Sequence, residues 1–251
     1  MNFPECSLIC PEGAYQILID TEKEIAGAAR IRPGDLARWM ERATEAHLES
    51  YGLSRAGLKA EGKIWVISWT SIDILRMPQL GEQLLLRLWP GKPRGGMYSR
   101  RYAFCTVSGE PLACAASLFA LMDSQTRKMA EGTGQVKAIP VVTQENEQPL
   151  PKMRMNFPEQ ADCKIRRTVT PGEIDLNGHL NNTHYIDWAE DVLDTLDAPE
   201  SGMKSLWIQY SRELKEGQEV VLACSLTEEA LYIRGLDHDT EAFLAKIQIK
   251  E

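Results

Sequence analysis

The sequence predicts an α+β protein made of two tandem copies of one unit, each a long helix followed by an antiparallel sheet. Two observations support this: a faint repeat at half the chain length, and the same order of helix-like and strand-like segments in both halves. The first half contains I-R-P-G-D-L at Ile31–Leu36, and V-T-P-G-E-I follows 138 residues later at Val169–Ile174. Internal duplication of a single fold is therefore the first prediction.

A second pair of segments lies in the same order. The residues of Ile72–Leu86 match those of Ile208–Leu222 at an offset of 136 residues. The matched positions include an arginine and a glycine in each copy, Arg76 with Arg212 and Gly81 with Gly217. Two sparse matches in the same order favour duplication over chance.

Each P-G pair is followed by apolar residues at helical spacing, which predicts one helix per half. In the first half these are Leu36, Trp39, Met40, Ala43, Ala46 and His47. In the second half they are Tyr185, Ile186, Trp188, Ala189, Val192, Leu193 and Leu196.

Only strand-like runs follow each helix. In the first half they are Ile64–Leu75, Leu84–Trp89, Met97–Val107 and Leu112–Met122, with a hairpin turn at Ser108–Pro111. In the second half they are Leu206–Tyr210, Val220–Leu226, Leu231–Arg234 and Ala242–Ile249. A sheet with one apolar face needs a cover, and the helix of its own half can supply it. We therefore expect an N-terminal repeat over 1–123, a surface linker over 124–160 and a C-terminal repeat over 161–251.

Composition excludes several classes of protein. The chain is 43% hydrophobic and 25% charged, as ordinary globular proteins are. A net charge of −8 argues against nucleic-acid binding, and no apolar run approaches the ~20 residues that span a bilayer. The N-terminal residues lack a signal-peptide pattern, so the cytoplasm is expected. The scattered cysteines suggest free thiols and no zinc site: Cys6, Cys10, Cys105, Cys114, Cys163 and Cys224.

The two halves differ where chemistry is expected. Only the second half inserts E-I-D-L-N-G-H-L-N-N between P-G and its helix, so Asp175, Asn177 and His179 have no counterparts. If the segment is extended, these alternate side chains face one pocket, and Gly178 permits a bend before the helix. Asn182 is a candidate helix cap.

Glu213 falls opposite the apolar Met77 in the repeat alignment, so a carboxylate is again unique to the second half. A carboxylate can activate water, and the free N–H groups at the helix start can stabilise an oxyanion. Such a site needs no metal or other cofactor.

Structural roles remain open for the same residues. Asp175 and Asn177 suit turns, His179 and His184 can be structural, and Glu213 can pair with Arg212 or Lys215. A metal site built from Asp175, His179, His184 and Glu213 is a weak alternative, because the spacing matches no ligand pattern. The chain lacks G-x-S-x-G, G-x-G-x-x-G and P-loop motifs, so α/β-hydrolase and nucleotide-binding functions are unsupported.

The run T-P-G-E-I-D-L-N-G-H-L-N-N-T-H-Y-I-D-W resembles the signature of acyl–acyl carrier protein (ACP) thioesterases, the plant FatA/FatB type and its bacterial relatives. Trp65–Glu82 and Ala115–Lys128 are also similar to segments of that family. The resemblance implies a double hotdog fold and hydrolysis of acyl-ACP to free fatty acid and ACP. It assigns catalytic roles to Asp175, Asn177, His179 and Glu213.

Further expectations follow from the resemblance. Plant members have a cysteine after the glutamate, but here Leu214 follows Glu213, which excludes a cysteine nucleophile there and leaves carboxylate-activated water. The family implies that the first half shapes the acyl pocket, with candidates Trp65, Ile67, Trp69, Ile72 and Ile74.

An acidic chain needs a local basic patch to bind an acidic carrier. Candidate clusters are Lys92, Arg94, Arg100 and Arg101, and Lys164, Arg166 and Arg167. The sequence leaves open a monomer or a homodimer. It also leaves open an acyl-CoA thioesterase, a non-enzymatic acyl-binding protein or an enoyl-thioester hydratase.

Overall fold

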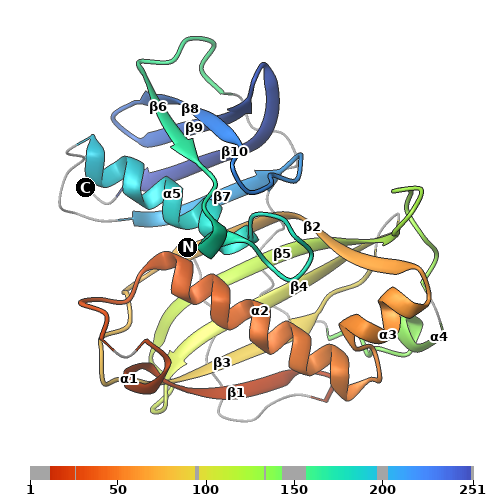
Figure 1. The fold of residues 1–251 in the computed structure, drawn as a ribbon. Coiled ribbons are helices and arrows are strands. Elements are labelled where there is room, and N and C mark those ends of the chain that lie inside the picture. The colour runs from red at the N-terminus through yellow and green to blue at the C-terminus, as the bar shows by residue number, and fades with distance from the viewer. Residues whose placement is uncertain are drawn as a thin grey trace. The chain divides into compact units, whose positions relative to one another are not determined.

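The computed structural model describes residues 12–25, 27–93, 96–132, 134–142, 157–196 and 203–249 (Figure 1). Contacts within the chain divide it into two compact units. The first comprises Met1–Ser68 and Ile74–Leu150, and the second comprises Trp69–Asp73 and Pro151–Glu251.

The first unit is a sheet with one long helix across its face (Figure 1). Its strand order is β1-β3-β4-β5-β2. The strands are β1 Tyr15–Asp20, β2 Lys63–Ile74, β3 Gln83–Pro90, β4 Met97–Thr106 and β5 Pro111–Asp123. The helices are α1 Thr21–Glu24, α2 Pro33–Ser50, α3 Arg55–Ala60 and α4 Gly134–Lys137.

The second unit repeats this plan around helix α5, Asn182–Thr195. Its strand order is β7-β10-β9-β8-β6, and Trp69–Asp73 of β2 pairs antiparallel with β7. The strands are β6 Cys163–Thr168, β7 Met203–Tyr210, β8 Glu219–Leu226, β9 Ala230–Asp237 and β10 Thr240–Ile249, and a 3₁₀ turn, η1, covers Pro171–Glu173.

The matching order of elements confirms the predicted fold class of two tandem α+β repeats. In each unit a strand precedes the helix and pairs with the second strand that follows it: β1 with β3, and β6 with β8. The predicted helices and the eight predicted strands are present, but β1 and β6 were missed. Strand β6 reads C-K-I-R-R-T, and Arg167 breaks its alternation because it occupies a half-buried position where an apolar residue is expected. The first unit also contains the short helix α3 after α2, where only strand-like runs were predicted.

The repeated P-G pairs open the same capped turn in both units. The N–H of Arg32 donates to Asp35 Oδ2 at 2.8 Å, and the N–H of Thr170 donates to Glu173 Oε2 at 2.7 Å. In the first unit the helix continues from this turn to Ser50. In the second unit the turn ends after three residues, and the chain inserts 174–181 before α5 begins.

The second repeated segment also adopts equivalent geometry in the two units. The N–H groups of Leu75 and Arg76 both donate to the carbonyl of Leu112, as those of Ser211 and Arg212 donate to Ala242. The turn that follows needs a glycine, because Gly81 and Gly217 have φ angles of +83° and +78°.

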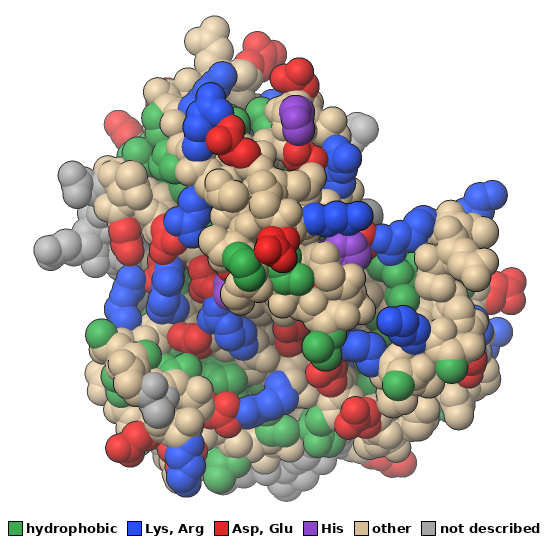
Figure 2. Space-filling model, viewed as in Figure 1, with side chains coloured by type: hydrophobic (Ala, Val, Ile, Leu, Met, Phe, Trp, Pro, Cys, Tyr) green, Lys and Arg blue, Asp and Glu red, His purple; other side chains and the backbone are tan. Residues whose placement is uncertain are grey.

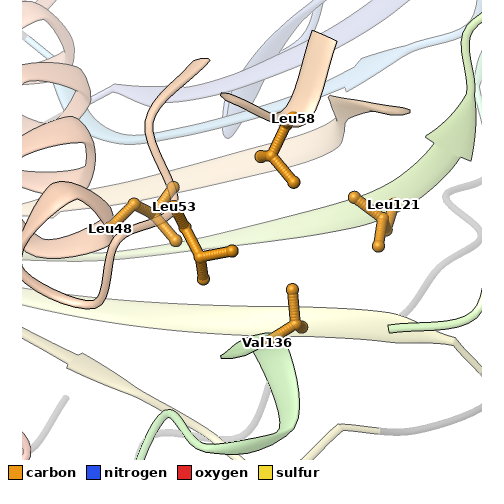
Figure 3. Close-up of a cluster of buried hydrophobic side chains, with 5 residues drawn as sticks. All are labelled: Leu48, Leu53, Leu58, Leu121 and Val136. Carbon is orange, nitrogen blue, oxygen red and sulfur yellow. The ribbon is translucent and has the colours of Figure 1, made fainter. Parts of the chain in front are cut away.

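Each unit has its own hydrophobic core. In the first unit α2 buries the predicted apolar stripe, and a further cluster joins α2, α3 and β5 to α4 through Leu48, Leu53, Leu58, Leu121 and Val136 (Figure 3). In the second unit α5 buries Tyr185, Ile186, Trp188 and Ala189. Val136 falls within the expected linker 124–160 but packs into the first unit. The limits of the two repeats and of the linker between them stay a prediction.

Candidate active site

The insertion 174–181 forms a tight turn held by one carboxylate. Asp175 Oδ1 accepts hydrogen bonds from the N–H groups of Asn177 (2.8 Å) and His179 (3.2 Å), and its Oδ2 accepts from Asn177 Nδ2 (3.0 Å). Backbone bonds close the turn, and Gly178 has a φ of +80°. The expected extended alternation was therefore wrong: the turn gathers Asp175, Asn177 and His179, because the short Asp side chain can bond its own backbone.

The start of α5 is capped by a different residue from the one expected. Asn181, and not Asn182, is the cap, because its Oδ1 accepts from the N–H (2.8 Å) and hydroxyl (2.7 Å) of Thr183. The His184 N–H donates to the Asn181 carbonyl at 3.0 Å. The N–H groups of Thr183 and His184 at the start of α5 therefore already have hydrogen-bond acceptors.

Glu213 lies three residues after β7 and meets the turn. The N–H of Leu180 donates to the carbonyl of Leu214 at 2.8 Å, which joins the two segments through their backbones. His179 Nε2 then lies 3.1 Å from Glu213 Oε2. Their side chains are 22% and 39% exposed, so water can reach the pair.

The two carboxylates therefore have different surroundings. Both oxygens of Asp175 accept hydrogen bonds from the turn, which suits a carboxylate that holds the turn in shape. Glu213 contacts the imidazole of His179, an arrangement in which one group can orient the other. The structure brings all four predicted catalytic residues into one unit, with Leu176 at the tip of the turn and 91% exposed.

Tyr185 is a buried residue of α5 close to this site, and the sequence had predicted for it only a place in the apolar stripe of the helix. Burial raises the pKa of its hydroxyl, a hydrogen bond with the backbone of Leu214 opposes that rise, and the charges of Glu213 and Asp175 add to it. The buried hydroxyl therefore stays protonated next to two carboxylates.

Glu173 is a second residue that the sequence analysis missed. It caps the 3₁₀ turn that precedes the site. Its spacing after Thr170 is that of a capping box, so this pattern was a readable signal.

His184 bonds within its own helix, Nδ1 to Asp187 Oδ2 at 3.0 Å. Within the described ranges, no group of three or more His, Cys, Asp and Glu residues is placed to hold a metal ion. The alternative of a metal site at Asp175, His179, His184 and Glu213 is therefore not supported.

The candidate acyl-pocket residues of β2 are buried or half-buried apolar side chains. Trp69, Ile72 and Ile74 are buried, while Trp65 and Ile67 are partly buried. Trp65 meets Tyr98 edge to face, with ring centroids 5.0 Å apart. Their role in binding an acyl chain stays a prediction.

The first basic cluster requires a correction. Arg100 and Arg101 are only 5% and 8% exposed, and Arg100 donates to His47 Nδ1 at 2.9 Å, so neither side chain is presented to a partner. Adjacent side chains of β4 point to opposite faces and both faces are buried here, which a count of basic residues does not reveal. Arg94 lies outside the described residues.

The second basic cluster divides between the two faces of β6. Lys164 and Arg166 are exposed, whereas Arg167 bonds Asp191 at 3.0 Å and lies over the ring of Trp188. On the face seen in Figure 2, basic and acidic side chains are interspersed.

Two units that each place one long helix across an antiparallel sheet define a double hotdog protein. The N-terminal domain model of acyl-ACP thioesterases matches residues 12–139, and the C-terminal domain model matches residues 158–249. The chain therefore belongs to the acyl-ACP thioesterase family.

Relatives and solved structures agree with this family. The chain is 28% identical over 199 residues to the chloroplastic acyl-[acyl-carrier-protein] hydrolase FATB2 of Cuphea viscosissima, covering 70% of this chain and 45% of the relative. It is 26% identical over 191 residues to a dodecanoyl-[acyl-carrier-protein] hydrolase of Cinnamomum camphora, covering 69% and 49%. The chain thus spans about half the length of these curated relatives.

Among solved structures, an acyl-ACP thioesterase from Bacteroides thetaiotaomicron has the same fold, with a TM-score of 0.81 and 18% identity over 95% of this chain and 98% of that one. A 12:0-ACP thioesterase from Umbellularia californica gives a TM-score of 0.77 and 20% identity over 96% and 98%. None of the helices in the described ranges is long and apolar enough to cross a membrane.

Proposed function

We propose that this protein hydrolyses fatty-acyl thioesters of ACP to the free acid and ACP, using water activated by Glu213. Family membership supports the reaction class, and the 3.1 Å contact between His179 and Glu213 carries the assignment of the site. Glu213 follows β7 in a half-exposed position that a substrate water can reach.

In the proposed reaction Glu213 takes a proton from water as the water oxygen attacks the thioester carbonyl carbon. The C–S bond then breaks, and the proton returns to the leaving thiolate, which gives a carboxylic acid and a free thiol. His179 orients Glu213 through their contact. Asn177 donates one amide hydrogen to Asp175, and its second amide hydrogen is assigned to the carbonyl oxygen.

The test measures thiol release from acyl-ACPs of several chain lengths. Replacing Glu213→Gln removes the base and keeps the shape, so we expect kcat to fall by at least about 100-fold. Glu216→Gln changes an exposed glutamate of the next turn and serves as the matched control. Full activity of Glu213→Gln would contradict the assigned mechanism.

Two variants of Asp175 distinguish a role in positioning the turn from a role as the general base. Asp175→Asn keeps a carbonyl oxygen for the N–H groups of Asn177 and His179, whereas Asp175→Ala removes every acceptor. We therefore expect the asparagine variant to retain most activity and the alanine variant to lose most of it. Equal loss in both variants would instead assign the chemistry to the Asp175 charge.

We also propose that Lys164 and Arg166 attract the acidic carrier protein, because both are exposed on β6. Lys164→Glu should raise KM for acyl-ACP and leave KM for acyl-CoA unchanged. The ratio of kcat/KM on the two carriers also decides between an ACP hydrolase and an acyl-CoA hydrolase. A KM for acyl-ACP that is unchanged in Lys164→Glu would remove Lys164 from the docking surface.

A further inference from the structure

The two segments that carry His179 and Glu213 are joined by a side chain as well as by backbone. Tyr210 is the last residue of β7 and stands three residues before Glu213. Its hydroxyl donates to the carbonyl of Asn182 at 3.1 Å. Asn182 is the first residue of α5 and stands three residues after His179.

This bond and the backbone bond from Leu180 to Leu214 flank Glu213 in one segment, and both join residues that follow His179 in the other. His179 and Leu180 precede Asn182 in one segment, and Glu213 lies between Tyr210 and Leu214 in the other. A single tie would leave the segments free to pivot about it. Two ties restrict that rotation, so the distance between His179 and Glu213 is determined by both.

The ring of Tyr210 is itself held in place. It packs edge to face against Tyr185, with centroids 5.4 Å apart, and Tyr185 packs in the same way against Phe243 at 5.0 Å. Tyr185 and Phe243 are fully buried, so they form a rigid support. The direction of the Tyr210 hydroxyl toward Asn182 follows from this packing.

We propose that Tyr210 is a positioning residue for the reaction: its hydroxyl holds the Glu213 segment against the start of α5 and so maintains the His179–Glu213 contact. The proposal rests on the proposed function. Tyr210 does not need to touch the substrate, because it acts through the backbone of α5.

The test uses Tyr210→Phe in the full chain, which keeps the ring and removes only the hydroxyl. We expect kcat on acyl-ACP to fall about 10-fold with little change in KM, since geometry and not binding is altered. Tyr232→Phe, which removes a hydroxyl from β9 in the same unit, is the matched control and should keep the wild-type kcat. A wild-type kcat in Tyr210→Phe would overturn the proposal.

A double-mutant cycle distinguishes positioning from general weakening of the fold. In the Glu213→Gln background, Tyr210→Phe should have no further effect on kcat, because the general base that Tyr210 helps to position is already absent. The same 10-fold loss in both backgrounds would show a structural role only and would also overturn the proposal.

A second readout does not depend on turnover. The imidazole NMR signal of His179, assigned with His179→Asn, should shift in Tyr210→Phe toward its position in Glu213→Gln. If the wild-type protein releases no thiol, the proposed function fails, and this signal alone decides whether Tyr210 holds the pair. An unshifted signal in Tyr210→Phe would overturn the positioning role.

Discussion

The indole nitrogen of Trp188 donates a hydrogen bond of 2.7 Å to Oε1 of Glu173. The other oxygen, Oε2, accepts from the N–H and hydroxyl of Thr170 at 2.7 and 2.8 Å. The Asn181 N–H also donates to the Glu173 carbonyl at 2.9 Å. Glu173 therefore ties the turn before the site insertion to the helix after it, which fixes both ends of the segment bearing His179.

The first prediction concerns this carboxylate. Burial raises the pKa of Glu173. Hydrogen bonds from Thr170 and Trp188 and the charge of the nearby His184 lower it, and together they outweigh burial, so the pKa lies below its ordinary value. A lowered folded-state pKa adds stability that is present above the unfolded-state pKa and is lost as the pH falls through the folded-state value. Glu173→Gln should therefore lower the free energy of unfolding by about 1 kcal/mol at pH 7.

Urea unfolding at pH 7 and at pH 3 checks this prediction. The difference between wild type and Glu173→Gln should shrink at pH 3, because the carboxylate of the unfolded chain is then protonated and the stability that comes from the lowered pKa decreases. Glu216→Gln is the exposed control. A difference that stays constant with pH would show that the charge of Glu173 is not its source.

The second prediction concerns His47, which is a buried residue of α2. Burial and the charge of Arg100 lower its pKa from 6.5 to about 4. The unfolded chain therefore binds a proton first as the pH falls, and stability is lost between about pH 6.5 and pH 4. The stability lost over this pH range is on the order of 3 kcal/mol.

Unfolding free energies measured across this pH range check the prediction. His47→Gln keeps an acceptor for Arg100 but cannot titrate, so its stability should vary less with pH over that window. Equal slopes for His47→Gln and wild type would contradict the assignment.

The third prediction concerns Cys224, which lies opposite Cys163 across β6 and β8. Burial, with the neighbouring Cys163 thiol, raises the pKa of Cys224 to about 12. The reactive species is the thiolate, so iodoacetamide at pH 8 should label Cys224 only after unfolding, while the half-buried Cys163 reacts faster. Peptide mass spectrometry measures both rates, and equal rates in the folded protein would refute the prediction.

The fourth prediction concerns Gly235 on β9. A Cβ atom there would lie 2.0 Å from Cε1 of Phe243, the ring that supports Tyr185. Gly235→Ala must displace this ring, so we expect a loss of about 1–3 kcal/mol in unfolding free energy. Gly172→Ala is the control, because nothing lies within 4 Å of its Cβ position. Thermal unfolding checks the pair, and a neutral Gly235→Ala would show that Phe243 is free to move.

Much of the fold was predictable because periodicity is a local property. The stripe from Leu36 to His47 and that from Tyr185 to Leu193 each predicted a helix that the structure contains. Strand β6 was not predictable in this way, since it is short and Arg167 occupies a half-buried position where alternation requires an apolar residue. The identity of the helix cap at Asn181 depended on a boundary one residue away from the expected one.

The sequence by itself determined the duplication, the insertion unique to the second half, and the candidates Asp175, Asn177, His179 and Glu213. These follow from residue order and spacing along the chain. Only the tertiary structure decided that Glu213 meets His179 and that Tyr210 joins their segments. The physical reason is that hydrogen bonds between residues about 30 positions apart depend on how α5 packs across its sheet, which no local pattern records.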